Sequence, residues 1–417
     1  MINVESQGHT SVQECRICTG TVQSVLRFGR MPVANGFLRE DEFGHEPFHE
    51  LELGRCPDCS MVQLIGNLDR SAMFHGHYAF YSSTSMHMQQ HFAKHARRLL
   101  DGLAGRPDPF VVELGSNDGI LLRHMLDAGT RHLGVEPSTN VAEVARQAGV
   151  QTRIDFFGRE TAEDILSAHG PADVITAANV MCHIDSLNDV LKGVEVLLHP
   201  DGILVFEDPY LMDILEKVSY DQIYDEHIFY FCLHSVDAMA ARHGLRVVDV
   251  EALDVHGGSM RYTLARPGSR PVADSVQALR EREAAMGVED PETYTGFAAN
   301  VRTSRERLVD AVRSARALGK RIVGYGATSK STTVINYCGL TPEDIEFISD
   351  TTPIKQGKFS PGAHIPVLAP EHFRASYPDI ALLFAWNHAR EIRDKERAFV
   401  DAGGKWLTYV PRVEISV

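Results

Sequence analysis

The sequence lacks long hydrophobic runs, and none approaches the roughly 20 apolar residues that a membrane-spanning helix needs. Residues 1–8 lack the basic start and apolar core of a secretory signal, so we expect a cytoplasmic protein with reduced cysteines. A basic excess is also absent, since the net charge is −15. Binding to a nucleic-acid polymer requires a basic face, and the charge argues against such a partner.

The remaining composition, with 44% hydrophobic and 23% charged residues, is that of a soluble globular protein. A chain of 417 residues is too long for one ordinary core and suits two or three domains. Changes in pattern along the chain predict three, at residues 1–85, 86–268 and 269–417.

Four of the seven cysteines form two close pairs, Cys15-Arg-Ile-Cys18 and Cys56-Pro-Asp-Cys59. Thiolates separated by two residues on a tight turn can hold one side of a tetrahedral zinc ion, and two such turns complete a four-thiolate site. We therefore predict a structural Zn²⁺ in a small N-terminal domain. A disulfide pair is the weaker alternative in a reducing compartment.

From residue 86 the pattern becomes that of an α/β domain. Residues 86–103 have a helical period that Pro107-Asp-Pro109 ends. Apolar strands at 110–114, 132–135, 173–177 and 202–206 then alternate with helical segments at 120–128, 140–148 and 187–198. The alternation predicts a doubly wound α/β sheet, and the alternating segment 260–265 predicts an antiparallel strand at its end.

The last third of the chain predicts a second, smaller α/β unit. Residues 269–320 are polar with a helical period and link to it, and strands are expected at 321–324, 345–349, 380–384 and 406–410.

The loop after the first central strand predicts a cofactor site. Small residues there let the backbone pass close to a ligand at the start of a helix, and such a loop alone could hold NAD. Glu113 and Asp118 would repel a pyrophosphate but can receive a cationic methionine moiety, which favours S-adenosylmethionine. The predicted donor residues are Glu113, Gly115, Ser116, Asn117, Asp118 and Gly119.

Three later segments, with four candidate residues, fit the same cofactor. Glu136 ends the second strand, where a carboxylate can accept both ribose hydroxyls. Asp155 can pair with the adenine amino group while Phe156 flanks the ring, and Asn179 follows the next strand beside the donor. The alternative is that Glu136 is a solvated acid and Phe156 a core residue.

The segment Tyr224-Asp-Glu-His227 is the candidate for proton transfer. A neutral histidine can remove a proton next to a carbonyl, and a neighbouring carboxylate such as Glu226 favours that role. His183 and Tyr78 could hold the resulting enolate oxygen. The alternative is that His227 caps a turn and Tyr224 packs in the core.

A glycine turn opens the C-terminal unit at Val323-Gly-Tyr-Gly-Ala-Thr-Ser-Lys330. A strand, a tight turn and a helix start with a lysine suit a pyrophosphate, although the spacing is not that of a P-loop. A packing turn with a surface lysine is the alternative.

These motifs, in this order, resemble the three-domain deoxysugar C-methyltransferases, which methylate a carbon of TDP-linked 4-keto sugars for antibiotics. The resemblance covers nearly the full length. Besides the motifs above, it rests on Met31-Pro-Val-Ala-Asn, Gly134-Val-Glu-Pro-Ser, Ala178-Asn-Val-Met-Cys-His-Ile, Glu207-Asp-Pro-Tyr, His256-Gly-Gly-Ser, Pro361-Gly-Ala-His-Ile-Pro-Val and Phe384-Ala-Trp-Asn-His.

The resemblance implies a zinc-binding N-terminal domain, a class I Rossmann-like methyltransferase domain and a second Rossmann-like C-terminal domain. His227 would be the base, and the substrate would be a nucleotide-linked keto-deoxysugar. The chain would act as a monomer and would not associate with a membrane. The sugar pocket would contain Tyr78, His183, Tyr224 and Glu226, with Tyr81 as a second candidate tyrosine, and the nucleotide would lie near Tyr325, Gly326, Ala327 and Lys330.

Two rival functions follow from the same motifs. One is an O- or N-methyltransferase acting on a nucleotide sugar. The other is a zinc-containing binding protein whose methyltransferase fold is inactive, and the intact acids Glu113, Asp118 and Glu136 argue against it.

Overall fold

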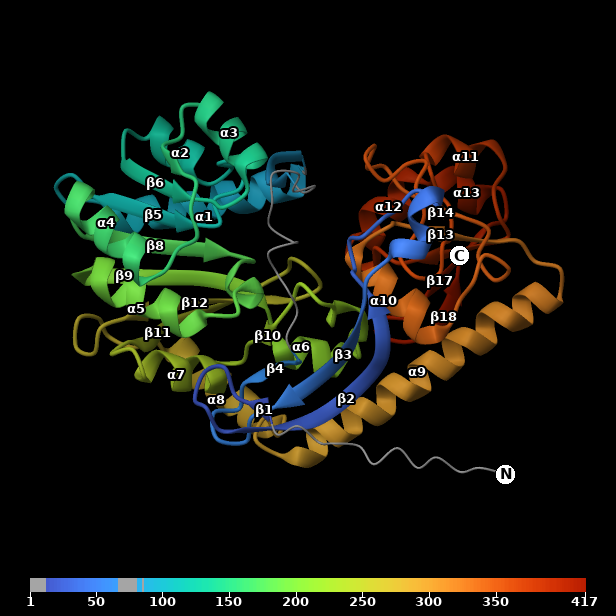
Figure 1. Ribbon diagram of the computed structural model, residues 1–417, viewed down its shortest axis with the longest axis horizontal. Helices are drawn as coiled ribbons and strands as arrows, with labels where there is room; N and C mark the ends of the chain where they lie inside the picture. The colour runs from blue at the N-terminus through green and yellow to red at the C-terminus, as the bar shows by residue number, and fades with distance from the viewer. Residues whose placement is uncertain (1–12, 67–80, 85) are drawn as a thin grey trace.

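The computed structural model describes residues 13–66, 81–84 and 86–417, which form three sheets (Figure 1). In Figure 1 the central unit and the C-terminal unit lie to either side of the long strands β2 (Thr21–Pro32) and β3 (Phe48–Arg55). Within the described ranges, no helix is both long and apolar enough to cross a bilayer.

The N-terminal sheet is antiparallel, with strand order β1-β2-β3-β4-β10. β1 (Gln13–Glu14), β2, β3 and β4 (Val62–Ile65) come from the first 65 residues, and the short 3-10 helix η1 (Glu40–His45) lies between β2 and β3. β10 (Phe229–Tyr230) comes from the middle of the chain and pairs with β4. The N-terminal sheet is therefore completed by the segment that follows His227.

The central sheet has seven strands in the order β11-β12-β9-β8-β5-β6-β7. The parallel strands are β5 (Phe110–Leu114), β6 (Arg131–Val135), β7 (Thr152–Arg153), β8 (Ala172–Ala178) and β9 (Leu198–Pro209). β12 (Ser259–Ala265) runs antiparallel to β9 and to β11 (Arg246–Leu253). The predicted doubly wound sheet with an antiparallel end is confirmed.

Helices α1 (Met86–Leu103), α2 (Leu122–Asp127), α3 (Thr139–Gln147) and α5 (Leu187–Leu197) correspond to the predicted ones. α4 (Arg159–His169) was not predicted. The remaining elements of this unit are η2 (Ser82–Thr84), η3 (Met181–His183), α6 (Leu211–Lys217), η4 (Tyr220–Gln222) and α7 (Leu233–Ala241).

The polar segment 269–320 forms two helices, α8 (Asp274–Ala285) and the long α9 (Pro291–Ala317). Buried Glu283 fixes α8 to the central unit, because its carboxylate accepts hydrogen bonds from the Tyr210 hydroxyl (2.9 Å) and the Leu233 amide (2.7 Å). The Asp290 side chain caps α9, with Pro291 at its first position. The structure thus packs residues up to 285 against the central unit.

The C-terminal sheet has the order β15-β14-β13-β16-β17-β18. β13 (Ile322–Tyr325), β14 (Ile348–Ser349), β15 (Val367–Leu368), β16 (Ile380–Leu383) and β17 (Lys405–Thr408) are parallel, and β18 (Glu414–Ser416) is antiparallel. Its helices are α10 (Ser329–Cys338), α11 (Pro370–Ala375), η5 (Trp386–His388), α12 (Ala389–Lys395) and α13 (Arg397–Asp401). This is the predicted second α/β unit.

Candidate active site

The four paired cysteines lie together at one end of the N-terminal sheet. Each pair sits on a turn closed by a backbone hydrogen bond, from the Cys15 amide to Gly20 O (2.7 Å) and from the Cys56 amide to Met61 O (2.9 Å). All four sulfur atoms lie within 4.8 Å of one another, and none forms a disulfide. Four thiols grouped in this way fit a tetrahedral metal ion.

The glycine loop after β5 passes very close to the strand beside it. Gly115 has φ +63°, and a Cβ atom there would lie 2.5 Å from the Val180 side chain. A Cβ on Gly134 of β6 would likewise lie 2.3 Å from Ser116 Oγ. The loop lies where β5 pairs with β6 on one side and β8 on the other, at the carboxyl ends where α/β sheets bind ligands.

Glu113, near the end of β5, is a buried acid, and the main charges of the described residues that act on it are negative. Its side chain is 3% exposed, and one carboxylate oxygen has no hydrogen-bond partner among the described residues. Burial raises the pKa of Glu113 well above its usual value, and the nearby Glu136, Asp118 and Glu207 raise it further. A bound cation would reverse this effect, so the site is suited to a positively charged ligand.

Glu136 lies at the end of β6 and is only 5% exposed, so the alternative of a solvated acid is wrong. Its carboxylate accepts hydrogen bonds from the amides of Asn117 (2.9 Å) and Ser138 (2.8 Å), while burial raises its pKa. Each carboxylate oxygen can accept two bonds, which leaves capacity for hydroxyl donors.

The predicted adenine residues lie at the surface. The ring of Phe156 is 64% exposed, so the core alternative is wrong for this residue. Asp155 accepts hydrogen bonds from Arg153 (2.8 and 3.0 Å) and from the Phe156 amide (2.9 Å), which fixes the carboxylate beside the ring. An exposed aromatic ring next to an oriented acid is suited to stacking and pairing with a base.

Asn117, Asp118 and Asn179 complete the loop region. Asn117 Oδ1 accepts from the Ser82 amide (3.0 Å), and Asp118 accepts from the Ser83 amide (3.1 Å) and hydroxyl (2.5 Å). Both side chains therefore hold η2, the segment before α1. Asn179 has φ +56° after β8, and its amide donates to Glu207 O (2.7 Å).

His227 is buried with a defined orientation. Its Nδ1 atom lies 3.2 Å from the backbone oxygen of Gln222, and Nε2 lies 2.7 Å from the Tyr224 hydroxyl. A carbonyl only accepts, so Nδ1 carries the proton and Nε2 is the basic nitrogen. Burial lowers the pKa of His227 well below its usual value, with further lowering by His183, Lys330 and His256, which keeps the ring neutral.

His183 lies beside His227, with 4.9 Å between the ring centroids. It sits on η3, directly after β8, and its Nδ1 donates to Glu226 O (2.7 Å). The Ile228 amide donates to Cys182 O (2.7 Å), so the segment that carries His227 is fixed to the turn after β8. Because Val180 in that turn lies against Gly115, the glycine loop after β5 and the two histidines belong to one region.

Buried Asp208 contacts this turn, and sequence reasoning noted its Glu207-Asp-Pro-Tyr motif without giving the residue a role. One of its oxygens accepts from the Cys182 amide (3.3 Å), and burial raises the pKa of Asp208 to about 7. Its neighbour Glu207 behaves differently: burial opposes ionisation, but hydrogen bonding from His91 and the charge of Arg261 lower the pKa of Glu207 to about 2.

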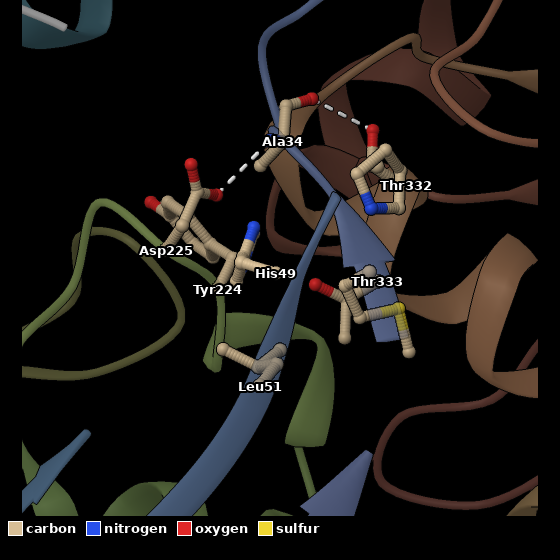
Figure 2. Close-up of a pocket in the computed structure, with 9 residues that line it drawn as sticks. Ala34, His49, Leu51, Tyr224, Asp225, Thr332 and Thr333 are labelled. Carbon is tan, nitrogen blue, oxygen red and sulfur yellow. Dashed lines mark hydrogen bonds between the residues drawn. The ribbon is translucent and has the colours of Figure 1, made fainter. Parts of the chain in front are cut away.

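All three units hold the loop that carries Tyr224 to His227. Figure 2 shows a small pocket in which Ala34 contacts both Asp225 and Thr332. The Ala34 amide donates to Asp225 (3.0 Å), and Ala34 O accepts from the Thr332 hydroxyl (2.7 Å). Asn35 donates to Glu226 (2.7 Å). Sequence reasoning noted the Met31-Pro-Val-Ala-Asn motif but not this contact.

Asp221 forms a second buried junction, between η4 and the C-terminal unit. It accepts hydrogen bonds from Trp386 Nε1 (2.6 Å) and the Tyr409 hydroxyl (2.8 Å). The Thr333 hydroxyl donates to Ile223 O (3.0 Å). The candidate base therefore lies next to the interface of the central and C-terminal units.

In the C-terminal glycine turn, the Tyr325 side chain points into its own unit and Lys330 points toward the central unit. The Tyr325 side chain points into the core of its own unit, where its hydroxyl donates to Glu396 (2.9 Å), so only its backbone faces the turn. Gly326 has φ +93°, and the Ala327 amide donates to Asp350 (2.6 Å). Lys330 reaches the central unit, donating to His256 O (3.3 Å), and is not a simple surface lysine.

Of the predicted site residues, Tyr78 lies outside the residues that the structure describes. Tyr81 is described, and its hydroxyl accepts a hydrogen bond from Asn140 (3.0 Å). Tyr81, the second candidate tyrosine for the sugar pocket, therefore contacts α3.

Three family models match successive parts of the chain. Residues 15–74 match the family described as putative zinc binding domain, residues 84–250 the family described as methyltransferase domain, and residues 254–411 the family described as C-methyltransferase C-terminal domain.

The C-methyltransferase NovU of Streptomyces niveus is 36% identical over 408 residues, which cover 97% of each chain. A ubiquinone biosynthesis O-methyltransferase of Cupriavidus pinatubonensis is 25% identical over 40% of this chain and 72% of its own. Among solved structures, magnesium protoporphyrin IX methyltransferase of Synechocystis with bound SAH covers 43% of this chain and 82% of its own, with 13% identity and a TM-score of 0.34.

Proposed function

The chain belongs to the C-methyltransferase family that includes NovU, and on this premise we propose that it methylates a carbon atom of a nucleotide-linked 4-keto-deoxysugar. The methyl donor is S-adenosylmethionine, and we propose TDP as the nucleotide and an antibiotic sugar as the product. The observation that carries the proposal is the buried His227, whose Nδ1 faces Gln222 O and whose Nε2 lies 2.7 Å from the Tyr224 hydroxyl.

The residues present fit both cofactors. Bound S-adenosylmethionine supplies an electrophilic methyl group on a sulfonium. Buried Glu113 would receive the cationic part of the donor, Glu136 the ribose, and Asp155 with Phe156 the adenine. Zn²⁺ held by Cys15, Cys18, Cys56 and Cys59 would join two turns of the N-terminal unit and take no part in the chemistry.

The proposed reaction begins with proton removal. The ketone acidifies the adjacent C–H bond, His227 Nε2 takes that proton, and the C–H bonding pair forms the enolate. Gln222 O keeps the other nitrogen protonated, so Nε2 stays available. Tyr224, His183 and Tyr78 would hold the developing enolate oxygen. Bound S-adenosylmethionine would supply the methyl group to the enolate carbon and leave as S-adenosylhomocysteine, with the C–S bonding pair on sulfur.

We place the nucleotide between the central and C-terminal units. Lys330 bridges these units through His256 O, and Gly326 provides a turn that leaves little space for a side chain. A lysine at the start of α10 is suited to a diphosphate. In this proposal Gly326, Ala327 and the backbone of Tyr325 line the phosphate side, and Glu226 lies on the sugar side.

The test isolates proton removal from methyl transfer. Enzyme, S-adenosylhomocysteine and a TDP-4-keto-deoxysugar are incubated in deuterated water, and the recovered sugar is analysed by mass spectrometry. Wild-type protein should incorporate deuterium next to the ketone, and His227→Asn should lower the rate by about 10² to 10⁴. The His227→Asn variant should bind S-adenosylhomocysteine as tightly as the wild type does.

His199→Asn is the matched control, because His199 lies at the opposite end of β9 from the site. Unchanged exchange in the His227→Asn variant would exclude His227 as the base and make His183 the next candidate. A wild type that methylates the sugar when S-adenosylmethionine is supplied, but shows no exchange in the test above, would instead favour the O- or N-methyltransferase.

A further inference from the structure

The acid–base chemistry leaves one feature of the site unexplained, the thiol beside the two histidines. Cys182 Sγ and one ring nitrogen each of His183 and His227 lie within 4.8 Å of one another. Cys182 and His227 are buried, and His183 is half-buried. Two imidazoles and a thiol at this separation can act as ligands to a single ion.

The orientation of both rings supports such a site. Each histidine donates its Nδ1–H to a backbone oxygen, His227 to Gln222 O (3.2 Å) and His183 to Glu226 O (2.7 Å). Metal-binding histidines are held in this way, because a partner on one nitrogen fixes the tautomer and directs the other at the metal. Nε2 is therefore the basic nitrogen in both rings.

The surrounding structure fixes the three ligands relative to one another. The Ile228 amide donates to Cys182 O (2.7 Å), which joins the two segments that carry the ligands. The Asp208 carboxylate accepts a hydrogen bond from the Cys182 amide (3.3 Å) and also interacts with the Cys182 side chain. An acid at this position favours added positive charge nearby.

We infer that Cys182, His183 and His227 form a second metal site, for a thiophilic divalent cation of the Zn²⁺ class. On binding, the Cys182 sulfur exchanges its proton for the metal, and the two Nε2 atoms donate their lone pairs. With three protein ligands the fourth position is open to water. Mg²⁺ is excluded by ligand type, since it prefers oxygen ligands.

The consequence for catalysis rests on the proposed function. The metal occupies His227 Nε2, the nitrogen proposed to take the substrate proton, and displaces the Tyr224 hydroxyl from it. The cation therefore inhibits methyl transfer reversibly, and a chelator restores activity. The binding itself does not depend on the role of His227.

The test uses full-length protein loaded with one equivalent of zinc and titrated with Co²⁺ without oxygen. Co²⁺ binds such ligands more weakly than Zn²⁺ and leaves the four-cysteine site occupied. The wild type should take up one equivalent of cobalt, measured by equilibrium dialysis, with a thiolate-to-cobalt charge-transfer band. Cys182→Ser should retain its zinc, lose the band and methylate without inhibition.

Cys338→Ser is the control, since Cys338 is a buried thiol on α10 that is not part of the cluster. It should bind cobalt as the wild type does. A wild type that takes up no cobalt, or a Cys182→Ser variant that binds it equally, would overturn the metal site. Cys182-dependent binding without inhibition would leave the site standing and refute His227 as the base.

Discussion

Glu113 allows the donor site to be tested without the sugar substrate. Its carboxyl group is buried next to Glu136 and Asp118, and its pKa is raised well above the usual value in the unliganded protein. A cationic donor stabilises the carboxylate and lowers that pKa. Between the pKa of the free protein and that of the complex, donor binding therefore releases a proton, and donor affinity rises with pH.

The size of the effect follows from charge and burial. Release of one full proton changes the affinity about tenfold per pH unit, or roughly 1.4 kcal/mol. A unit charge pair at 4 Å is worth about 4 kcal/mol at an effective dielectric of 20, part of which offsets the cost of ionising a buried acid. Glu113→Gln should therefore weaken donor binding by about 3 kcal/mol, or roughly 150-fold.

Isothermal titration calorimetry with S-adenosylmethionine, in buffers with different ionisation enthalpies, measures the donor affinity and the number of protons released on binding. The wild type should show proton release that Glu113→Gln abolishes. Glu143→Gln on α3 is the control, because the Glu143 side chain is 48% exposed and should leave affinity and proton release unchanged. Binding that is independent of pH in the wild type and equally tight in Glu113→Gln would refute the reasoning.

Two further predictions concern the four-cysteine site and the junction at Asp221. Cys56→Ser should lose the bound zinc, measured by elemental mass spectrometry, and lower the melting temperature, because metal binding stabilises the folded state; zinc retained at one equivalent would contradict this. Asp221→Ala leaves the buried donors of Trp386 and Tyr409 without their acceptor, so the free energy of unfolding in urea should fall by about 2 to 4 kcal/mol. Exposed Asp310→Ala should change it by less than about 0.5 kcal/mol, and equal values for the two variants would refute the role of Asp221.

The central unit was predicted most closely. β5 and α1 have the predicted bounds, because an apolar run and a helical period are local patterns that Pro107 and the glycine loop interrupt. α4 was missed, although Gly158 and the helical period that follows it were available as signals. The paired cysteines were predicted for the same local reason, since each turn is encoded within a few residues.

The sequence alone therefore determined most of the elements and the glycine turn after β5, whereas the donor role of that turn stays a prediction. Only the tertiary structure decided how they are held: Asn35 contacts Glu226 across 191 positions, β10 completes the N-terminal sheet, and the Tyr325 ring points into its own core. The tautomer of His227 was settled by Gln222 O. Periodicity and turn residues act over a few positions, whereas such contacts depend on how whole units pack, and no local pattern encodes that.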